Sequence, residues 1–570
     1  MKKIISVLLC LALVAGIVTI GVSAENKPDL SFAVASDLHY NRPSEELEKT
    51  NDDPIFWYAN RRCAMDDESG FILDEFLNQC AENDDCQFIL IPGDMADDGR
   101  TRPEDHRDVA EKFRAFEQKT GKQIYVINGN HDASPDSNTT YTLFKEIYHE
   151  FGYAEALSLR EDDCSYTADL GAKYRLIALD SNNPNASTED GMTTDKIEWV
   201  HEQTKLAKAD GRYPILMMHH NLLDHMPLQR IISRNFIVRF HYTTAELFAD
   251  WGIKFVLSGH EHCSDAASFT SALGNKISDF ATTALSMYPL QYRMFYFTDE
   301  EIKYEAKTIE KIDYNALTST VKGYTDEMIN CMKSGLNEYA RNFLKVGVAY
   351  RLKLQFAKTD VPRDKFYGQV VMKALDRLDE ILELPIKGEN GLQALALQYG
   401  IIIPDSDYKN GWDIVGEAMA AHYEGSENYK LDSALVTSIL RTVVLILRND
   451  IAVVSDEMLI KWANDALESS GFTPIADNIT KLCVQIFGTY THIEYFFMAI
   501  LSPFVYSFTC DDNDIDDNNG TIEGYGTASF ESNINNIAAN LNNIIAKVKL
   551  FTEMFMKYFI KAINFCTPIR

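Results

Sequence analysis

The strongest constraint on the fold is a regular alternation, between residues 30 and about 310, of short apolar runs with helical patterns. The apolar runs are rich in β-branched residues, which favour strands over helices. Six such runs are clear, at residues 30–36, 86–91, 123–127, 174–179, 213–218 and 253–257. Strands that alternate with helices in this way predict a layered α/β domain.

Two amphipathic helices are expected to cover the sheet of this domain. Apolar residues recur at positions i, i+3, i+4 and i+7 in two segments, which are Leu73, Phe76, Leu77 and Cys80, and Phe144, Ile147, Tyr148 and Phe151. Residues 294–308 alternate around a turn at Asp299 and Glu300, which predicts a hairpin. We expect this hairpin to end the domain at about residue 310.

The chain beyond residue 311 follows a helical pattern instead. Residues 434–447 are apolar nearly all round, and a second apolar face is formed by Val371, Leu375, Leu378 and Leu382. Because Arg441 and Arg448 interrupt residues 434–447, we interpret that stretch as a buried core helix and not as a membrane span. These patterns predict an all-helical C-terminal domain over residues 311–570.

The first residues have the features of an export signal. Lys2 and Lys3 precede an apolar run over residues 4–22, and Ser23 and Ala24 provide the small side chains of a cleavage site. We therefore expect a signal peptide over residues 1–24 and a secreted or cell-surface protein. The apolar run approaches membrane-spanning length, so an uncleaved anchor is the alternative.

The formal net charge of −30 argues against one class of partner. Nucleic-acid duplexes are bound by clustered Lys and Arg side chains that release counterions, so we expect no duplex binding. The same charge does not exclude a phosphate substrate, because bound divalent cations would invert the local field at one site.

An acidic segment near the C-terminus matches part of a calcium-binding loop. Asp512, Asp514, Asp516 and Glu523 fall at positions 1, 3, 5 and 12 of such a loop. Position 6 is Asp517 instead of the glycine that the sharp turn requires. We therefore favour a solvated acidic loop over a calcium site.

Residues 534–565 predict a terminal amphipathic helix, whose apolar stripe consists of Leu541, Ile544, Ile545, Val548, Phe555 and Phe559. Docking of this stripe onto the helical domain is the favoured interpretation. Lys547, Lys557 and Lys561 add positive charge, so contact with a membrane surface or the cell envelope is the alternative.

Five short polar blocks each follow a predicted strand, where open α/β sheets place their ligand-binding loops. The first block is Asp37-Leu38-His39. Residues i and i+2 point the same way as the chain leaves a strand, so Asp37 and His39 could meet one cation. An isolated pair of this kind is more often a capping aspartate beside a surface histidine.

The second block begins with Gly93 and Asp94. The glycine lets the turn close, which frees Asp94 to present both carboxylate oxygens, as bridging of two cations requires. We interpret Asp97 and Asp98 as turn and helix-start residues.

The third block is Gly129-Asn130-His131-Asp132. Asn130 offers a neutral carbonyl oxygen to a metal ion. His131 could donate a proton to a leaving oxygen or stabilise phosphoryl charge, because imidazole titrates near neutral pH. Asp132 would orient the loop.

The last two blocks supply histidines. In the fourth, one of His219 and His220 is expected to bind metal. In the fifth, His260 and His262 repeat the i, i+2 spacing and could send one imidazole to each of two metal ions. Joint occurrence of all five blocks at strand ends predicts a metal site.

The ordered set of blocks resembles the calcineurin-like metallophosphoesterase superfamily, over about the first half of the chain. The motifs that carry the resemblance are Asp37-x-His39, Gly93-Asp94, Gly129-Asn130-His131-Asp132, His219 and Gly259-His260-x-His262. The resemblance implies a four-layer β-sandwich flanked by helices in residues 25–310. It also implies two metal ions per chain, a divalent or mixed-valence pair for which nitrogen and oxygen ligands leave iron, manganese and zinc open.

The resemblance further implies a role for each residue. The first metal ion would be held by Asp37, His39, Asp94 and His262. The second would be held by Asp94, Asn130, His219 and His260, with Asp94 and a solvent species as bridges. His131 would be the catalytic residue. The family usually has a proline where Asn221 stands, two residues after the ligand, which favours His219 over His220 and leaves His220 as a packing histidine.

These residues predict an enzyme that hydrolyses a phosphate monoester or diester outside the cytoplasm. Two cations would polarise the phosphoryl oxygens and lower the pKa of a bridging water, and the resulting hydroxide would attack in line. His131 would assist the leaving group. The alternatives are a non-catalytic surface binding protein that retains a structural metal cage, and a housing for one structural zinc ion.

Overall fold

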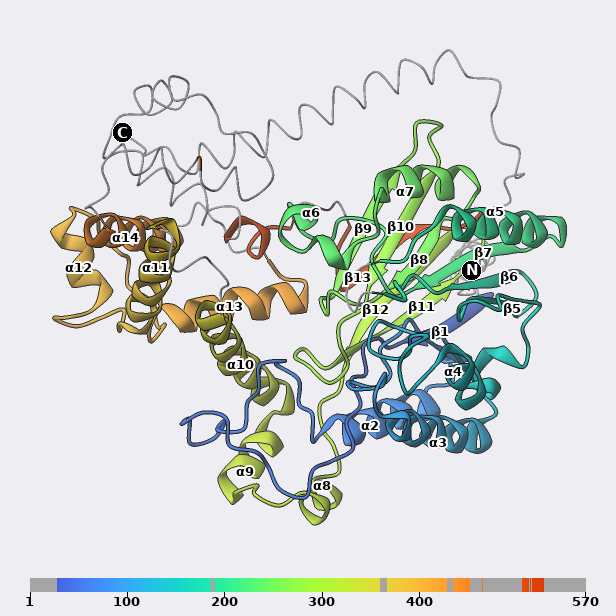
Figure 1. Ribbon diagram of the computed structural model, residues 1–570. Coiled ribbons are helices and arrows are strands. Elements are labelled where there is room, and N and C mark those ends of the chain that lie inside the picture. The colour runs from blue at the N-terminus through green and yellow to red at the C-terminus, as the bar shows by residue number, and fades with distance from the viewer. Residues whose placement is uncertain are drawn as a thin grey trace, which may run out of the picture.

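The computed structural model describes residues 28–185, 190–358, 366–427, 434–451, 464, 505–511, 513 and 515–526. The predicted signal peptide and the predicted helix at residues 534–565 lie outside these residues, as do Asp512 and Asp514 of the acidic segment. Figure 1 shows two sheets with helices around them, and a further group of helices to one side.

The first sheet has six strands in the order β13-β12-β11-β1-β2-β3. They are β1 (Leu30–Val34), β2 (Phe88–Ile91), β3 (Gln123–Val126), β11 (Gln291–Phe297), β12 (Glu301–Thr308) and β13 (Asn519–Glu523). Strands β1, β2 and β3 run parallel, with Ala33 opposite Ile89 and Ile89 opposite Ile124. Their carboxyl ends therefore meet at one edge of the sheet.

The second sheet has seven strands in the order β4-β5-β6-β7-β8-β10-β9. They are β4 (Ser158–Leu159), β5 (Tyr166–Leu170), β6 (Tyr174–Leu179), β7 (Tyr213–Met218), β8 (Phe255–Ser258), β9 (Asp265–Thr270) and β10 (Lys276–Ala281). Strands β6, β7 and β8 are parallel, with Ile177 opposite Leu216 and Leu216 opposite Val256.

Aromatic side chains fill the space between the two sheets. The ring of Phe32 on β1 lies 6.5 Å from that of Phe255 on β8. Phe295 on β11 contacts both, with ring centroids 5.5 Å from Phe32 and 5.0 Å from Phe255. All three side chains are fully buried, so the sheets form a sandwich around one core.

Helices cover the outer face of each sheet. The elements on the side of the first sheet are α2 (Ser69–Glu82), α3 (Pro103–Thr120), α4 (Tyr141–Ile147) and the π-helical turn η1 (His149–Tyr153). On the second sheet, α5 (Thr194–Ala209) packs on β6 and β7, and α7 (His241–Asp250) packs on β9 and β10. The chain between β7 and α7 holds the short helices α6 (Gln229–Ile232) and η2 (Arg234–Phe236).

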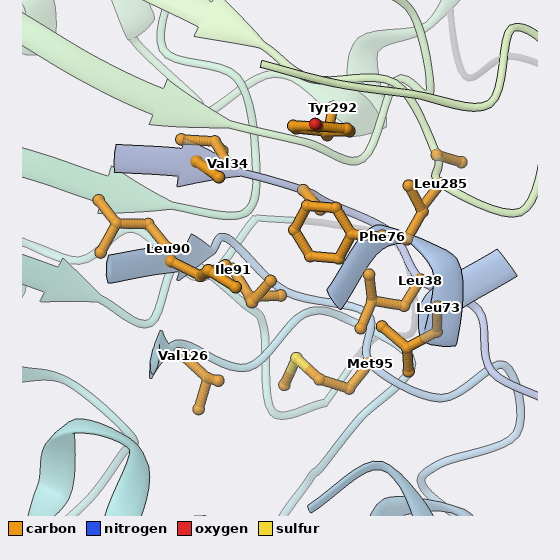
Figure 2. Close-up of a cluster of buried hydrophobic side chains, with 14 of the residues drawn as sticks. Val34, Leu38, Leu73, Phe76, Leu90, Ile91, Met95, Val126, Leu285 and Tyr292 are labelled. Atoms are coloured by element: carbon orange, nitrogen blue, oxygen red, sulfur yellow. The ribbon is translucent and has the colours of Figure 1, made fainter. Parts of the chain in front are cut away.

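Figure 2 shows how α2 packs under the first sheet. Leu73 and Phe76 of this helix lie among Leu38, Leu285 and Tyr292, and the rings of Phe76 and Tyr292 are 5.0 Å apart. The two helical layers and two sheets confirm the predicted four-layer sandwich.

The region after residue 310 is helical in its described residues, apart from β13. Its helices are α8 (Tyr314–Thr320), α9 (Asp326–Ser334), α10 (Leu336–Lys358), α11 (Phe366–Glu383), α12 (Leu392–Gln398), α13 (Gly411–Glu424) and α14 (Ala434–Ile451). Helix α14 buries Val443, Ile446 and Leu447 against α11 and α12, as predicted for a core helix. Among the described residues, no helix combines the length and apolarity needed to cross a membrane.

The predicted hairpin is present as β11 and β12, but β12 is not the edge of its sheet. Strand β13, from the far C-terminal part of the chain, pairs antiparallel with it, placing Glu301 opposite Glu523. Asp516 accepts hydrogen bonds from the backbone N–H groups of Asn518 and Asn519 just before this strand. The C-terminal half is therefore joined to the sandwich through a shared sheet.

Candidate metal centre

The five polar blocks lie at the carboxyl ends of β1, β2, β3, β7 and β8. At these ends the backbone takes an unusual shape. Of the nine non-glycine residues with positive φ in the described chain, five belong to the blocks, and they are Asp37, His39, Asp94, His260 and His262. Such conformations cost about 1–3 kcal/mol each and persist where the surrounding structure enforces them, often at functional sites.

One group of ligand atoms comes from Asp37, His39, Asp94 and His262, and all its atoms lie within 4.8 Å of one another. The Nε2 atom of His262 is 3.3 Å from Oδ1 of Asp37 and 3.0 Å from Nε2 of His39. The Nε2 atom of His39 is 3.7 Å from Oδ2 of Asp94.

A second group contains Asp94, His219 and His260. The Nε2 atom of His219 is 3.3 Å from Oδ2 of Asp94 and 2.9 Å from Oδ1 of Asn130. The rings of His219 and His260 are 4.7 Å apart. Asp94 belongs to both groups, so its carboxylate lies where two cations could share it.

The chemistry of these groups fits a pair of cations. Oδ2 of Asp94 and Nε2 of His260 are buried and have no hydrogen-bond partner. The facing Nε2 atoms of His39 and His262 place two lone pairs together unless a proton or a cation lies between them. Buried acceptors without donors are costly, and a cation would satisfy all of them.

The titration of the residues supports this reading. Burial lowers the pKa of His39, but Asp97, Asp94 and Asp37 outweigh it and raise that pKa to about 9. Burial raises the pKa of Asp94, but His219 and His131 hold it well below the usual range of a carboxyl. The carboxylates therefore stay ionised, and the centre holds protons in places that cations would take.

Residues 30–264 match the family model described as calcineurin-like phosphoesterase. They form a calcineurin-like phosphoesterase domain. The chain is thus a metal-dependent phosphoesterase, which confirms the resemblance predicted from the five blocks.

Solved structures similar to this phosphoesterase include the following three. A dimetal phosphatase from Danio rerio is 12% identical, with a TM-score of 0.34 over 50% of this chain and 97% of its own. Purple acid phosphatase PPD1 from yellow lupin (Lupinus luteus) seeds is 10% identical, with a TM-score of 0.33 over 52% of this chain and 57% of its own. NAD nucleotidase from Haemophilus influenzae is 13% identical, with a TM-score of 0.27 over 55% of this chain and 60% of its own. No curated protein matches the chain.

His131 lies beside the metal groups of the phosphoesterase domain. Its backbone N–H donates to Oδ1 of Asp94 at 2.8 Å. Its Nδ1 is 2.5 Å from the carbonyl oxygen of Asp97, which can only accept, so the proton sits on Nδ1 and Nε2 is left free. Burial lowers the pKa of this imidazole, which favours its neutral form.

Asp97 is a site residue that the sequence interpretation missed. Its carboxylate is buried, and Oδ1 is 2.9 Å from Nδ1 of His39 and 3.1 Å from Nη1 of Arg62. A carboxylate on the second nitrogen of a metal-binding histidine fixes the ring and raises its basicity. Asp98, in contrast, is exposed, as expected for a turn residue.

The supporting residues of the other blocks are also buried. Asp132 orients its loop as predicted, accepting from the N–H groups of Gly129 at 2.7 Å and Ala96 at 3.2 Å. His220 packs its ring 4.5 Å from that of His260. Asn221 donates from Nδ2 to the carbonyl oxygen of Gly259 at 3.1 Å, which ties the fourth block to the fifth without a proline.

Proposed function

We propose that this domain hydrolyses phosphate monoesters or diesters at two metal ions, outside the cytoplasm. The observation that carries the proposal is that Asp94 belongs to two groups of ligand atoms, one with Asp37, His39 and His262 and one with His219 and His260. The first metal ion would be held by Asp37, His39, Asp94 and His262, and the second by Asp94, Asn130, His219 and His260. The proposed location rests on the sequence of residues 1–24 alone.

When bound, the two cations polarise the phosphoryl group and make the attacking water more acidic. The side chains prepare the rest of the reaction. The backbone N–H of His131 donates to Oδ1 of Asp94, which fixes the carboxylate and leaves Oδ2 available to the metal ions. His131, with its proton held on Nδ1, presents Nε2 to the substrate, and in its protonated form it gives a proton to the leaving oxygen.

Purified full-length protein tests the proposal directly. We expect hydrolysis of bis(p-nitrophenyl) phosphate, p-nitrophenyl phosphate or both when Mn²⁺ is added to metal-free protein, and none without it. If neither ester is hydrolysed by protein that has bound two equivalents of metal, the proposed hydrolysis is wrong and a non-catalytic binding role takes its place. A panel of nucleotides, phospholipid head groups and phosphopeptides then defines the substrate class.

A further inference from the structure

The loop that carries His260 and His262 also carries a buried carboxylate between them. Glu261 is buried, and its carboxylate lies near side chains from two other elements. Its Oε2 accepts from Nε2 of Gln229 on α6 at 3.1 Å, and its Oε1 is 3.9 Å from Nε2 of His422 on α13. The metal loop therefore reaches the helical region through this side chain.

His422 is held between two carboxylates. Its other ring nitrogen, Nδ1, donates to Oε1 of Glu427 at 2.9 Å, and both side chains are buried. Burial lowers the pKa of His422, but Glu261 and Glu427 outweigh it and raise that pKa to about 10. His422 therefore forms a hydrogen bond with Glu427 and a longer ion pair, at 3.9 Å, with Glu261 of the metal loop.

Backbone contacts fix the same junction. The N–H of Ser264, two residues beyond His262, donates to the carbonyl oxygen of Tyr423 at 3.0 Å. A Cβ atom at Gly425 would lie 2.1 Å from the carbonyl oxygen of Ser264, so the two backbones approach each other too closely for any residue but glycine. Asn518 bonds to both sides, donating to the carbonyl oxygen of Glu424 at 2.7 Å and accepting from Oγ of Ser264 at 3.1 Å.

The backbone of the metal loop has an unusual conformation. His260 and His262 have φ values of 67° and 64°, in the left-handed region, which few non-glycine residues adopt. A loop in this shape needs external contacts to keep both imidazoles aimed at their metal ions. Glu261 is the residue between them, and its carboxylate adds a contact to those that the backbone makes through the N–H of His260 to Asp37 and the carbonyl oxygen of His262 to Thr283.

We propose that Glu261 and His422 are positioning residues, through which the helical region sets the geometry of the metal loop. The inference rests on the proposed function only in taking His260 and His262 as metal ligands. The helical region then contributes to the metal affinity of the phosphoesterase domain, although none of its residues is a proposed metal ligand.

The test measures Mn²⁺ binding to metal-free, full-length protein by isothermal titration calorimetry, so turnover is not needed. We expect Glu261→Gln and His422→Leu to bind Mn²⁺ about 10–100-fold more weakly than wild type, the usual effect of losing a partner that orients a metal ligand. His422→Gln, whose amide can still donate to one carboxylate, should recover part of that loss. His201→Gln is the matched control, because this partly exposed histidine of α5 stacks on Trp251 at the end of α7 and belongs to neither group of ligand atoms.

Thermal unfolding of each metal-free variant shows whether it is folded at the titration temperature. If His422→Leu does not fold, Glu261→Gln alone decides the result. Binding within about threefold of wild type in folded Glu261→Gln would overturn the inference and leave the proposed function intact. Absence of Mn²⁺ binding in wild type would overturn the proposed function itself.

Discussion

The Nε2 atoms of His39 and His262 lie 3.0 Å apart, although 223 residues separate the two histidines in the chain. At this distance the two ring nitrogens must share either a proton, in an N–H···N hydrogen bond, or a cation, because two lone pairs would otherwise face each other. Oδ1 of Asp37 is 3.3 Å from Nε2 of His262, so negative charge lies at the same point. The proposed first metal ion would take the place of that proton and would be held by all three side chains.

Replacement of His262 tests this cation directly. His262→Ala removes one proposed ligand from the first metal ion, and its side chain is partly exposed, so the fold should tolerate the change. We expect metal content to fall from two equivalents to about one per chain, measured by elemental analysis after dialysis. Retention of two equivalents would remove His262 from the ligand set.

Replacement of His131 separates catalysis from metal binding. His131→Ala should keep both metal ions, because the proposed ligands do not include this side chain. Its kcat should fall by about 100-fold to 10,000-fold, the usual contribution of a general acid. Steady-state kinetics on metal-saturated protein measure the effect, and a kcat equal to that of wild type would contradict the assigned role.

Asp97 and Asp98 form a matched pair of neighbours for a third prediction. Asp97→Asn weakens the contact that orients His39, so Mn²⁺ affinity should fall by about 10-fold to 100-fold. Asp98→Asn changes an exposed residue and should leave the affinity unchanged. Equal affinities of the two variants, measured by calorimetry, would mean that Asp97 is only a turn residue.

The contrast between Asp94 and Asp97 shows what the sequence can predict. Only Pro92 and Gly93 separate Asp94 from a strongly apolar strand, so its place at the edge of the sheet follows from a local pattern. Asp97 has the sequence context of a turn, and its partner His39 is 58 residues away. A contact over that distance leaves no local periodicity, so only the folded chain reveals it.

The same reasoning applies to the fold. The six apolar runs all became strands, because each is fully or nearly fully buried and strongly apolar. Strand β13 contains one strongly apolar residue, Ile522, and forms because β12 offers a free edge for pairing. Likewise, the link between Glu261 and His422 joins two polar residues from separate halves of the chain, and no pattern predicts such a pairing.

His422 also predicts a pH dependence of stability. Its pKa rises from the usual 6.5 to about 10 on folding, so the folded protein binds this proton more tightly. The resulting stabilisation is complete below pH 6.5 and is lost as the pH rises toward 10. Between pH 6.5 and 8, the free energy of unfolding of metal-free wild type should fall by up to about 2 kcal/mol more than that of His422→Gln. Urea denaturation at the two pH values measures this, and parallel changes in both proteins would contradict it.

Helix α10 packs closely against the turn that contains Asn60 and Arg62, and this contact gives a further prediction. A Cβ atom at Gly347 would lie 2.7 Å from the carbonyl oxygen of Asn60, in the turn that also carries Arg62, the partner of Asp97. Gly347→Ala should therefore lower the free energy of unfolding by about 1–3 kcal/mol.

Gly335→Ala provides the control for this substitution, because a Cβ atom there meets only Cβ of Glu338, at 3.7 Å. Its effect should stay within about 0.5 kcal/mol. Similar urea midpoints for the two variants would contradict the prediction and would show that α10 shifts to accommodate the added methyl group.

The central claim is that side chains from five strand ends bind two metal ions for phosphate-ester hydrolysis. Its most direct test is the rate of bis(p-nitrophenyl) phosphate or p-nitrophenyl phosphate hydrolysis by metal-free protein as Mn²⁺ is added at protein concentrations far above the dissociation constants. The account predicts no turnover before metal is added and a plateau at two equivalents per chain. Full turnover without metal, or a plateau at one equivalent, would contradict it.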